Sequence, residues 1–265
     1  MIHNTAIIHP SAKIAKDVEI GPYAIIGENT IIKSGVKIDS GAIVENAEIG
    51  ENCQIYSYAV IGTAPQSIKY KNEPTKLILG SDCIVREFVT LNRGTDASGK
   101  TIIGSNCYFM AYSHIAHDCI VGNNVTFANV ATIGGHVEVG DNAFLGGIVV
   151  VHQFCRIGKF AMLGGGTGTS QDILPFTMVV GPGHRTVVMG LNLVGIRRDP
   201  KVKDALEDIK SAYRTLFFSK IPLKEALNQL EVMNLHQEVK EMIDFIKTSK
   251  RGFCKPNRFN KEEQL

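Results

Sequence analysis

The sequence predicts an all-β solenoid, a parallel β-helix, followed by a C-terminal α-helical domain. Three observations indicate this fold class: an apolar residue recurs every six positions through the first two thirds of the chain, glycine often follows it, and the period becomes helical from about Pro200. A period of six fits neither an α-helix nor a simple alternating strand, but it fits a coil in which each hexad forms one strand and one turn. We assign residues 1–190 to the β-helix and 191–265 to the helical domain.

The apolar residues of the repeat are expected to face inward and to stack into columns. If three hexads complete one triangular coil, residues about 18 apart lie above one another, separated by the strand spacing of about 4.8 Å. A first run spans Ile8 to Ile38, and after a five-residue step the repeat resumes at Ile43 and continues to Ile61. Leu79 to Leu91 keep the spacing, and a last run is unbroken from Ile103 to Leu163.

Two polar segments interrupt the repeat, near residues 63–75 and 92–101. Both are rich in turn-forming residues, so we expect them to leave the coil as loops. Loops that project from a rigid scaffold often carry specificity. The segment Gln171–Pro182 contains two prolines and a glycine and is interpreted as a connector.

Helical spacing begins near Pro200. One predicted helix face consists of Val202, Ala205, Leu206, Ile209 and Tyr213. A second helix is expected from Pro222-Leu223 and a third around residues 239–246. An open solenoid ends in unpaired strand edges, so these helices are expected to cover one end of it.

Composition excludes several classes of function. A net charge of +2 and the lack of a basic run with interleaved aromatics give no reason to expect binding to nucleic acid or lipid. The start of the chain lacks the features of a secretory signal, and no stretch is apolar enough to span a membrane. Six scattered cysteines without a CxxC pair indicate reduced thiols, and we expect a cytoplasmic protein.

Histidines gather at one corner of the predicted coil. His114 and His117 share a hexad, and His136 and His152 follow in the next two coils. These four side chains would line a strip about 10 Å long, two strand spacings, bordered by Asp118 and Gln153.

The strip has the composition of an acyl-transfer site. A neutral imidazole is suited to act as a general base near neutral pH. Asp118 could hold the ring of His117 in one tautomer, and a backbone N–H at the Gly134-Gly135 turn could approach a developing oxyanion. Since the chain has no nucleophile elbow and no phosphate-binding P-loop, direct transfer with a histidine base is favoured over a covalent enzyme.

Several segments carry a specific resemblance. They are His114-Ile-Ala-His-Asp118, Gly134-Gly-His136, Val151-His-Gln-Phe154, Pro65-Gln-Ser-Ile-Lys-Tyr70, Ile84-Val-Arg-Glu-Phe-Val-Thr90 and Gly190-Leu-Asn192. The chain resembles, over essentially its whole length, the UDP-N-acetylglucosamine O-acyltransferase family of lipid A biosynthesis. The resemblance implies a left-handed β-helix, a homotrimer and active sites between subunits.

The resemblance also implies a reaction and the roles of particular residues. A 3-hydroxyacyl group would move from acyl carrier protein to the 3-hydroxyl of UDP-N-acetylglucosamine, with no cofactor besides the phosphopantetheine of the carrier and no metal. His117 would be the general base, Asp118 would orient it, and the Gly135 N–H would stabilise the oxyanion. Substrate contacts are expected from His114, His136, Gln153, Lys69, Gln66, His152, Asn192 and Arg198, and acyl-chain length would depend on Gly165 and Met162.

Two positions depart from the family pattern. Ser67 stands where the family has an aspartate that contacts the acceptor sugar, so a 3-amino sugar nucleotide is an alternative acceptor. Val194 stands where an acid is common, so nucleotide contacts from that segment are expected to differ. Gly165 leaves room for a long chain. Acyl carrier protein is acidic, and the basic residues Arg156, Lys159, Arg197 and Arg198 are candidate contacts for it.

Other classes of protein share this solenoid. A trimeric zinc carbonic anhydrase takes histidine ligands from neighbouring subunits, and His114, His117 and His136 fit that pattern. A non-catalytic scaffold has no need to align four histidines with glycine turns. An N-acyltransferase of the same pathway normally carries an extra N-terminal domain, which we do not expect because the hexads begin by Ile8.

Overall fold

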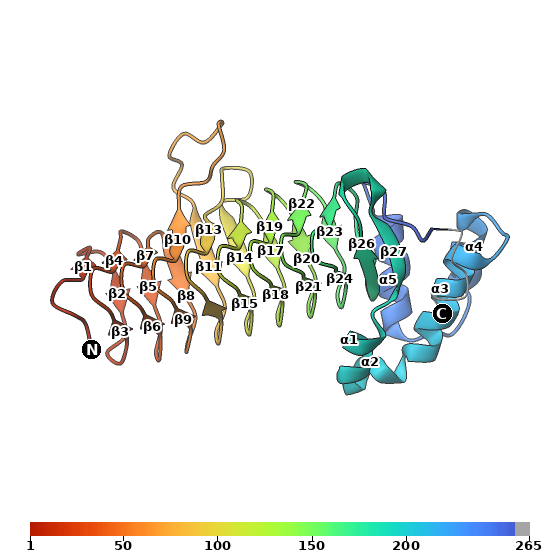
Figure 1. Cartoon of the computed structure of the whole chain (residues 1–265), viewed down its shortest axis with the longest axis horizontal. Coiled ribbons are helices and arrows are strands. Elements are labelled where there is room, and N and C mark those ends of the chain that lie inside the picture. The colour runs from red at the N-terminus through yellow and green to blue at the C-terminus, as the bar shows by residue number, and fades with distance from the viewer. Residues whose placement is uncertain (258–265) are drawn as a thin grey trace.

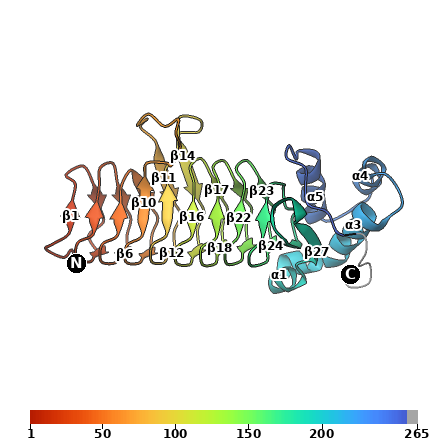
Figure 2. The ribbon, with the colours of Figure 1, turned by 45° about the horizontal axis from the view of Figure 1, so that its top comes forward.

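The structure, a computed structural model, describes residues 1–257. Its short strands form three sheets, which are the faces of a triangular prism that the chain visits in turn. Figure 1 shows the coils in a row, with the helices at the C-terminal end, and Figure 2 shows the same row turned toward the viewer. The fold is the left-handed parallel β-helix that the sequence and its resemblance predicted.

The three faces run the length of the prism. The first face contains β1 (Ile7–Ile8), β4 (Ile25–Ile26), β7 (Ile43–Val44), β10 (Val60–Thr63), β13 (Thr90–Asn92), β16 (His114–Ile115), β19 (Thr132–Ile133), β22 (Val150–Val151) and β25 (Gly168–Thr169). The second contains β2 (Lys13–Ile14), β5 (Ile31–Ile32), β8 (Ala47–Ile49), β11 (Lys76–Leu79), β14 (Lys100–Ile103), β17 (Ile120–Val121), β20 (Glu138–Val139) and β23 (Arg156–Ile157). The third contains β3 (Glu19–Ile20), β6 (Lys37–Ile38), β9 (Gln54–Ile55), β12 (Ile84–Val85), β15 (Tyr108–Phe109), β18 (Thr126–Phe127), β21 (Phe144–Leu145), β24 (Met162–Leu163), β26 (Thr177–Val180) and β27 (Val187–Leu191).

Stacked apolar side chains fill the prism. In a regular coil each strand pairs with the residues 18 positions on, as His114 does with Thr132, and the second residue of the strand is buried. One position of the expected repeat was wrong: Val44, with no exposed surface, faces the core, whereas Ile43 points outward. The five-residue step therefore lies between Val44 and Ile49. The sequence was ambiguous there because both residues of β7 are apolar.

The chain leaves the prism through a strand pair and five helices. The expected connector 171–182 was wrong in part, because β26 continues the third face and β27 returns antiparallel to it. A 3₁₀ turn (Gly183–Arg185) joins them, and the helices are α1 (Leu193–Arg198), α2 (Pro200–Asp204), α3 (Leu206–Phe218), α4 (Leu223–Glu231) and α5 (Gln237–Lys247). The helix expected from Pro200 is broken at Ala205, although Val202, Ile209 and Tyr213 are buried together with it as predicted.

The two expected loops project from the same side of the prism. They occupy residues 64–75, between β10 and β11, and residues 93–99, between β13 and β14 (Figures 1 and 2). Both lie at the corner between the first and second faces, which we call the catalytic corner. Every helix in the described part of the chain is too short or too polar to cross a membrane.

Candidate active site

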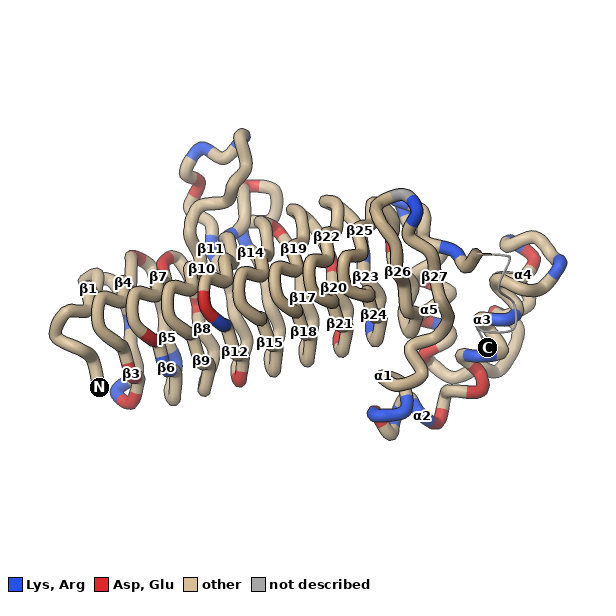
Figure 3. Tube along the Cα trace, in the orientation of Figure 1, with Lys and Arg blue, Asp and Glu red and all other residues tan. Residues whose placement is uncertain are grey.

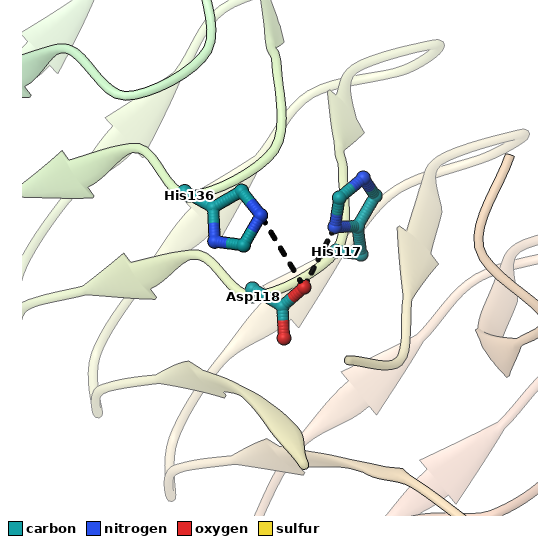
Figure 4. Close-up of side chains that lie close together, drawn as sticks. All are labelled: His117, Asp118 and His136. Atoms are coloured by element: carbon teal, nitrogen blue, oxygen red, sulfur yellow. Dashed lines mark hydrogen bonds and ion pairs between the residues drawn. The ribbon is translucent and has the colours of Figure 1, made fainter. Parts of the chain in front are cut away.

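The catalytic corner brings together residues from successive coils. His117 and Asp118 follow β16, Gly135 and His136 follow β19, and the next coil places Gln153 there. Asp118 and His136 both adopt the left-handed backbone conformation, with φ near +60°. Figure 4 shows the two imidazoles on either side of the carboxylate. The 18-residue spacing therefore placed this group as the sequence predicted.

His117 is held in one orientation by its neighbour. Its Nδ1 lies 2.7 Å from Asp118 Oδ2, and the carboxylate can only accept, so Nδ1 carries the proton. The lone pair is then on Nε2, which makes no hydrogen bond within residues 1–257, and the side chain is 17% exposed. A fixed ring with a free, partly exposed acceptor nitrogen has the geometry of a general base.

Asp118 is the buried partner in this pair. Its side chain has no exposed surface. Burial by itself raises the pKa of a carboxyl group, but hydrogen bonds from Ser98, Thr95 and His117 outweigh burial and lower the pKa of Asp118 to about 2. The carboxylate is therefore ionised across the whole range in which an imidazole titrates.

Gly135 lies against the imidazole of His117. A Cβ atom at position 135 would stand 2.6 Å from Cε1 and 2.7 Å from Nε2 of His117, so glycine is required for the ring to sit where it does. The Gly135 N–H has no hydrogen-bond acceptor in the described part of the chain. A backbone donor thus remains available beside the basic nitrogen.

His136 and His114 flank the pair and stay neutral to lower pH than ordinary imidazoles. Burial lowers the pKa of both rings. The ring of His136 stands at 90° to that of His117, with centroids 5.2 Å apart, and stacks on Phe154 at 4.5 Å. His114 Nδ1 lies 2.6 Å from the hydroxyl of Thr90 on the neighbouring strand.

His152 and Gln153 extend the catalytic corner by one coil. Both side chains are exposed. Arg251 lies 3.2 Å from Nδ1 of His152, which is also 3.1 Å from the carbonyl of Gln153, and Arg251 donates to the carbonyl of Ser170. The returning C-terminal segment therefore fixes one end of the histidine strip.

The 64–75 loop presents the residues expected to contact the sugar. Gln66 and Lys69 are exposed, and Ser67 is half-buried. Arg93 ties the loop down: it donates to the Tyr70 hydroxyl at 3.0 Å, and to Glu45 Oε1 and the Gly62 carbonyl at 3.0 Å each. Since only 12% of the Arg93 side chain is exposed, these hydrogen bonds are well shielded from water.

Arg93→Met is expected to raise the KM for the acceptor about tenfold, equivalent to about 1.4 kcal/mol, with a smaller change in kcat. Methionine keeps the apolar stem but releases the loop that carries Gln66 and Lys69. Steady-state kinetics at varied acceptor concentration measure this change. Arg214→Met, an exposed position on α3, is the matched control, and an equal KM in the two variants would contradict the role of Arg93.

Four other expected site residues lie away from the catalytic corner. Met162, Asn192 and Arg198 line a largely apolar cavity of about 980 Å³ between the third face and α1–α2. The third face does not border the catalytic corner, so one chain does not bring these residues to His117. Gly165 lies exposed at the corner between the third and first faces, where a Cβ would meet only the Gly147 carbonyl, at 3.5 Å.

Some polar residues of this region are already bonded within the chain. Asn192 caps α1 through Gly195 and donates to the Phe160 carbonyl. Arg156 contacts Thr248 and the Phe245 carbonyl, and Lys159 pairs with Glu241, so both hold α5 against the prism. This leaves Arg197 and Arg198 as the better-placed candidates for a carrier contact, in the region of α1 and α2 where Lys and Arg gather (Figure 3).

The same geometry bears on a metal-binding role. His117, Asp118 and His136 each offer a donor atom, all within 4.8 Å of one another. However, both oxygens of Asp118 already accept hydrogen bonds from Thr95, and Nδ1 of His117 is protonated toward it. His114 is turned to Thr90. The carboxylate of Asp118, Nδ1 of His117 and Nδ1 of His114 are therefore committed to hydrogen bonds, while Nε2 of His117 is free, and these commitments disfavour the zinc alternative.

Sequence reasoning missed the residues that support the site. Thr95, Ser98, Arg93 and Arg251 contact it from loops or from the C-terminal return, where no periodicity relates sequence to position. Phe154 could have been found, because it lies 18 residues after His136 and stacks on it.

Comparison with known proteins agrees with this site. The family model described as bacterial transferase hexapeptide (six repeats) matches residues 100–135, and the model described as Udp N-acetylglucosamine O-acyltransferase, Domain 2, matches residues 172–254. A β-helix of hexads with a histidine–aspartate pair at one corner defines the protein as a hexapeptide-repeat transferase.

Similar proteins show which family of hexapeptide-repeat transferases the chain belongs to. The acyl-[acyl-carrier-protein]–UDP-N-acetylglucosamine O-acyltransferase of Trichlorobacter lovleyi is 51% identical over 96% of this chain and 99% of its own length, and that of Aquifex aeolicus is 54% identical over 77% and 78%. The solved UDP-N-acetylglucosamine acyltransferase from Campylobacter jejuni superposes with a TM-score of 0.90 at 39% identity, covering 97% of this chain and 100% of that one. The chain belongs to the UDP-N-acetylglucosamine O-acyltransferase family.

Proposed function

We propose that the protein transfers a 3-hydroxyacyl chain from acyl carrier protein to the 3-hydroxyl of UDP-N-acetylglucosamine, the first step of lipid A biosynthesis. The observation that carries the proposal is the pairing of Asp118 with His117 beside the unbonded Gly135 N–H. This arrangement supplies a base and an oxyanion donor at one point.

The geometry supports a direct transfer. Nε2 of His117 takes the proton of the acceptor hydroxyl as its oxygen attacks the thioester carbonyl. The N–H of Gly135 donates to the oxyanion of the tetrahedral intermediate. Collapse of the intermediate breaks the C–S bond, and the phosphopantetheine thiolate takes the proton back from His117. Atoms and charge balance without a covalent enzyme intermediate, so no metal or bound cofactor is required.

The same function calls for more than one copy of the chain, and we propose the homotrimer that the family resemblance implies. Met162 and Arg198 lie across the prism from His117, so a second copy of the chain must bring its cavity to the catalytic corner if all these residues meet the substrates. Exposed apolar residues at the corner between the third and first faces, among them Tyr58, Phe88 and Tyr112, form a stacked column suited to such packing. Six unpaired cysteines are consistent with the reducing cytoplasm.

The test is an acyl-transfer assay with 3-hydroxymyristoyl carrier protein and UDP-N-acetylglucosamine, followed by mass spectrometry of the nucleotide. We expect a product that gains one hydroxyacyl group and loses it in mild base, as an ester does. Absence of product with this acceptor, but a base-stable product with the 3-amino analogue, would overturn the acceptor assignment in favour of the alternative that Ser67 raises.

A further inference from the structure

We propose that Thr95 and Ser98 are positioning residues of the acyl transfer, which fix the carboxylate of Asp118 so that it can hold His117 as a base. The inference rests on the proposed function. Both residues lie in the 93–99 loop, which the repeat does not explain and which no expected substrate contact involves.

The 93–99 loop forms the catalytic corner in the coil that precedes the one with His117 and Asp118. β13 pairs with β16 and β14 pairs with β17, so residues 93–99 lie one coil before residues 116–119, which carry His117 and Asp118. The corner at 116–119 needs only four residues to join its strands, whereas this one has seven. The additional length lets the loop fold over and reach the carboxylate of Asp118.

Three hydrogen bonds join the loop to Asp118. The Thr95 N–H donates to Oδ1 at 3.0 Å and the Thr95 hydroxyl to Oδ2 at 2.6 Å. The Ser98 hydroxyl also contacts Oδ1. Ser98 has a single proton and a second possible acceptor, the Lys100 carbonyl at 2.8 Å. The carboxylate is the stronger acceptor, so the proton is assigned to Asp118.

Burial makes these donors necessary. An ionised carboxylate without exposed surface must be hydrogen-bonded, or it takes up a proton. Within residues 1–257, the hydrogen-bond donors to the two oxygens are His117, Thr95 and Ser98. The loop therefore supplies every one of these donors except the base itself: Thr95 is buried, at 8% exposed, whereas Ser98 lies at the surface.

The Thr95 hydroxyl and His117 Nδ1 share a single oxygen, Oδ2. Removing the hydroxyl frees the carboxylate to turn, which lowers kcat. It also leaves more negative charge for the imidazole, which favours the protonated ring and moves the acid limb of the pH profile to higher pH. The other titratable groups near Asp118 are His136, at 3.7 Å, and the buried thiol of Cys119, while Asp96 and Lys100 are exposed.

The first experiment compares Thr95→Val, Thr95→Ser and Ser98→Ala in steady-state assays from pH 5 to 9. For Thr95→Val we expect kcat to fall about tenfold, KM values to stay within about twofold, and the acid limb to rise by about half a pH unit. Thr95→Ser should keep at least about half of the activity, and Ser98→Ala should change in the same direction as Thr95→Val. Thr215→Val, on α3, is the matched control.

A double-mutant cycle with Asp118→Asn separates positioning from mere stability. If Thr95 acts through Asp118, Thr95→Val should change kcat by less than about twofold in the Asn background. Equal losses in both backgrounds, or an unchanged kcat and pH profile in Thr95→Val, would overturn the inference. Should Thr95→Val not fold, the pH profile of Ser98→Ala decides. An inactive wild-type protein would instead refute the proposed function itself.

Discussion

Replacement of His117 by alanine is expected to lower kcat by about 10²- to 10⁴-fold, the usual contribution of a general base. The ring is held by Asp118 and its Nε2 is free, whereas His136, the other imidazole beside this carboxylate, lies farther away, with its Nε2 3.7 Å from Oδ2. Since the side chain lies at the surface of the corner, its removal leaves the stacked core untouched.

The assay for His117→Ala is the transfer reaction at saturating substrates, with thermal unfolding and oligomer mass measured on the same sample. His9→Ala is the matched control, because the His9 side chain is exposed and, within residues 1–257, forms hydrogen bonds only with Ser11 of its own turn. Retention of more than about one per cent of the wild-type kcat would contradict the assignment of the base. A change in the oligomer mass together with loss of activity would leave a structural role as the explanation.

Gly135→Ala is expected to lower kcat about 100-fold, the second large effect. The new methyl group would overlap the imidazole of His117 at 2.6–2.7 Å, and the ring cannot simply rotate away while Asp118 holds Nδ1. Relief of the overlap requires His117 to swing toward solvent, which moves the base from the substrate and opens the space beside the Gly135 N–H.

The effect of Gly135→Ala is measured in a second double-mutant cycle, with His117→Ala. In a His117→Ala background the overlap no longer exists, so Gly135→Ala should add less than about threefold to the loss if it acts through the ring. A full 100-fold additional loss of kcat in the His117→Ala background would instead assign the effect to the oxyanion donor, the N–H of residue 135, alone. A crystal structure of Gly135→Ala with His117 in its original place would contradict the steric argument.

The fold could be predicted because the sequence repeats every six residues. Because side chains 18 residues apart stack, His117, Gly135 and Gln153 could be placed at one corner without any structure. The same rule failed where the repeat is ambiguous or absent. Both residues of β7 are apolar, so the repeat could not show which one faces inward. Residues 93–99 carry no hexad, and their contacts with Asp118 depend on a loop conformation that composition does not specify.

The sequence also did not predict that the expected site residues lie in two separate places of one chain. A column of stacked side chains along one corner does not indicate which face a distant segment packs against. In the structure, α1 places Asn192 and Arg198 against the third face. A repeat describes a single chain, whereas the proposed site between subunits would be defined by the relation between two chains.

The coil that contains Asn46 is one residue shorter than a regular coil, since Ile31 pairs with Glu48 seventeen positions on rather than eighteen. The strands on either side remain in register, and the whole deficit is taken up at the corner. The 64–75 and 93–99 loops show the opposite case, with residues added at the same corner and no shift in the faces. Chain length is therefore free to change at corners and constrained along faces. Insertions and deletions among natural variants should fall at corners, where new binding loops can arise without disturbing the stacked core.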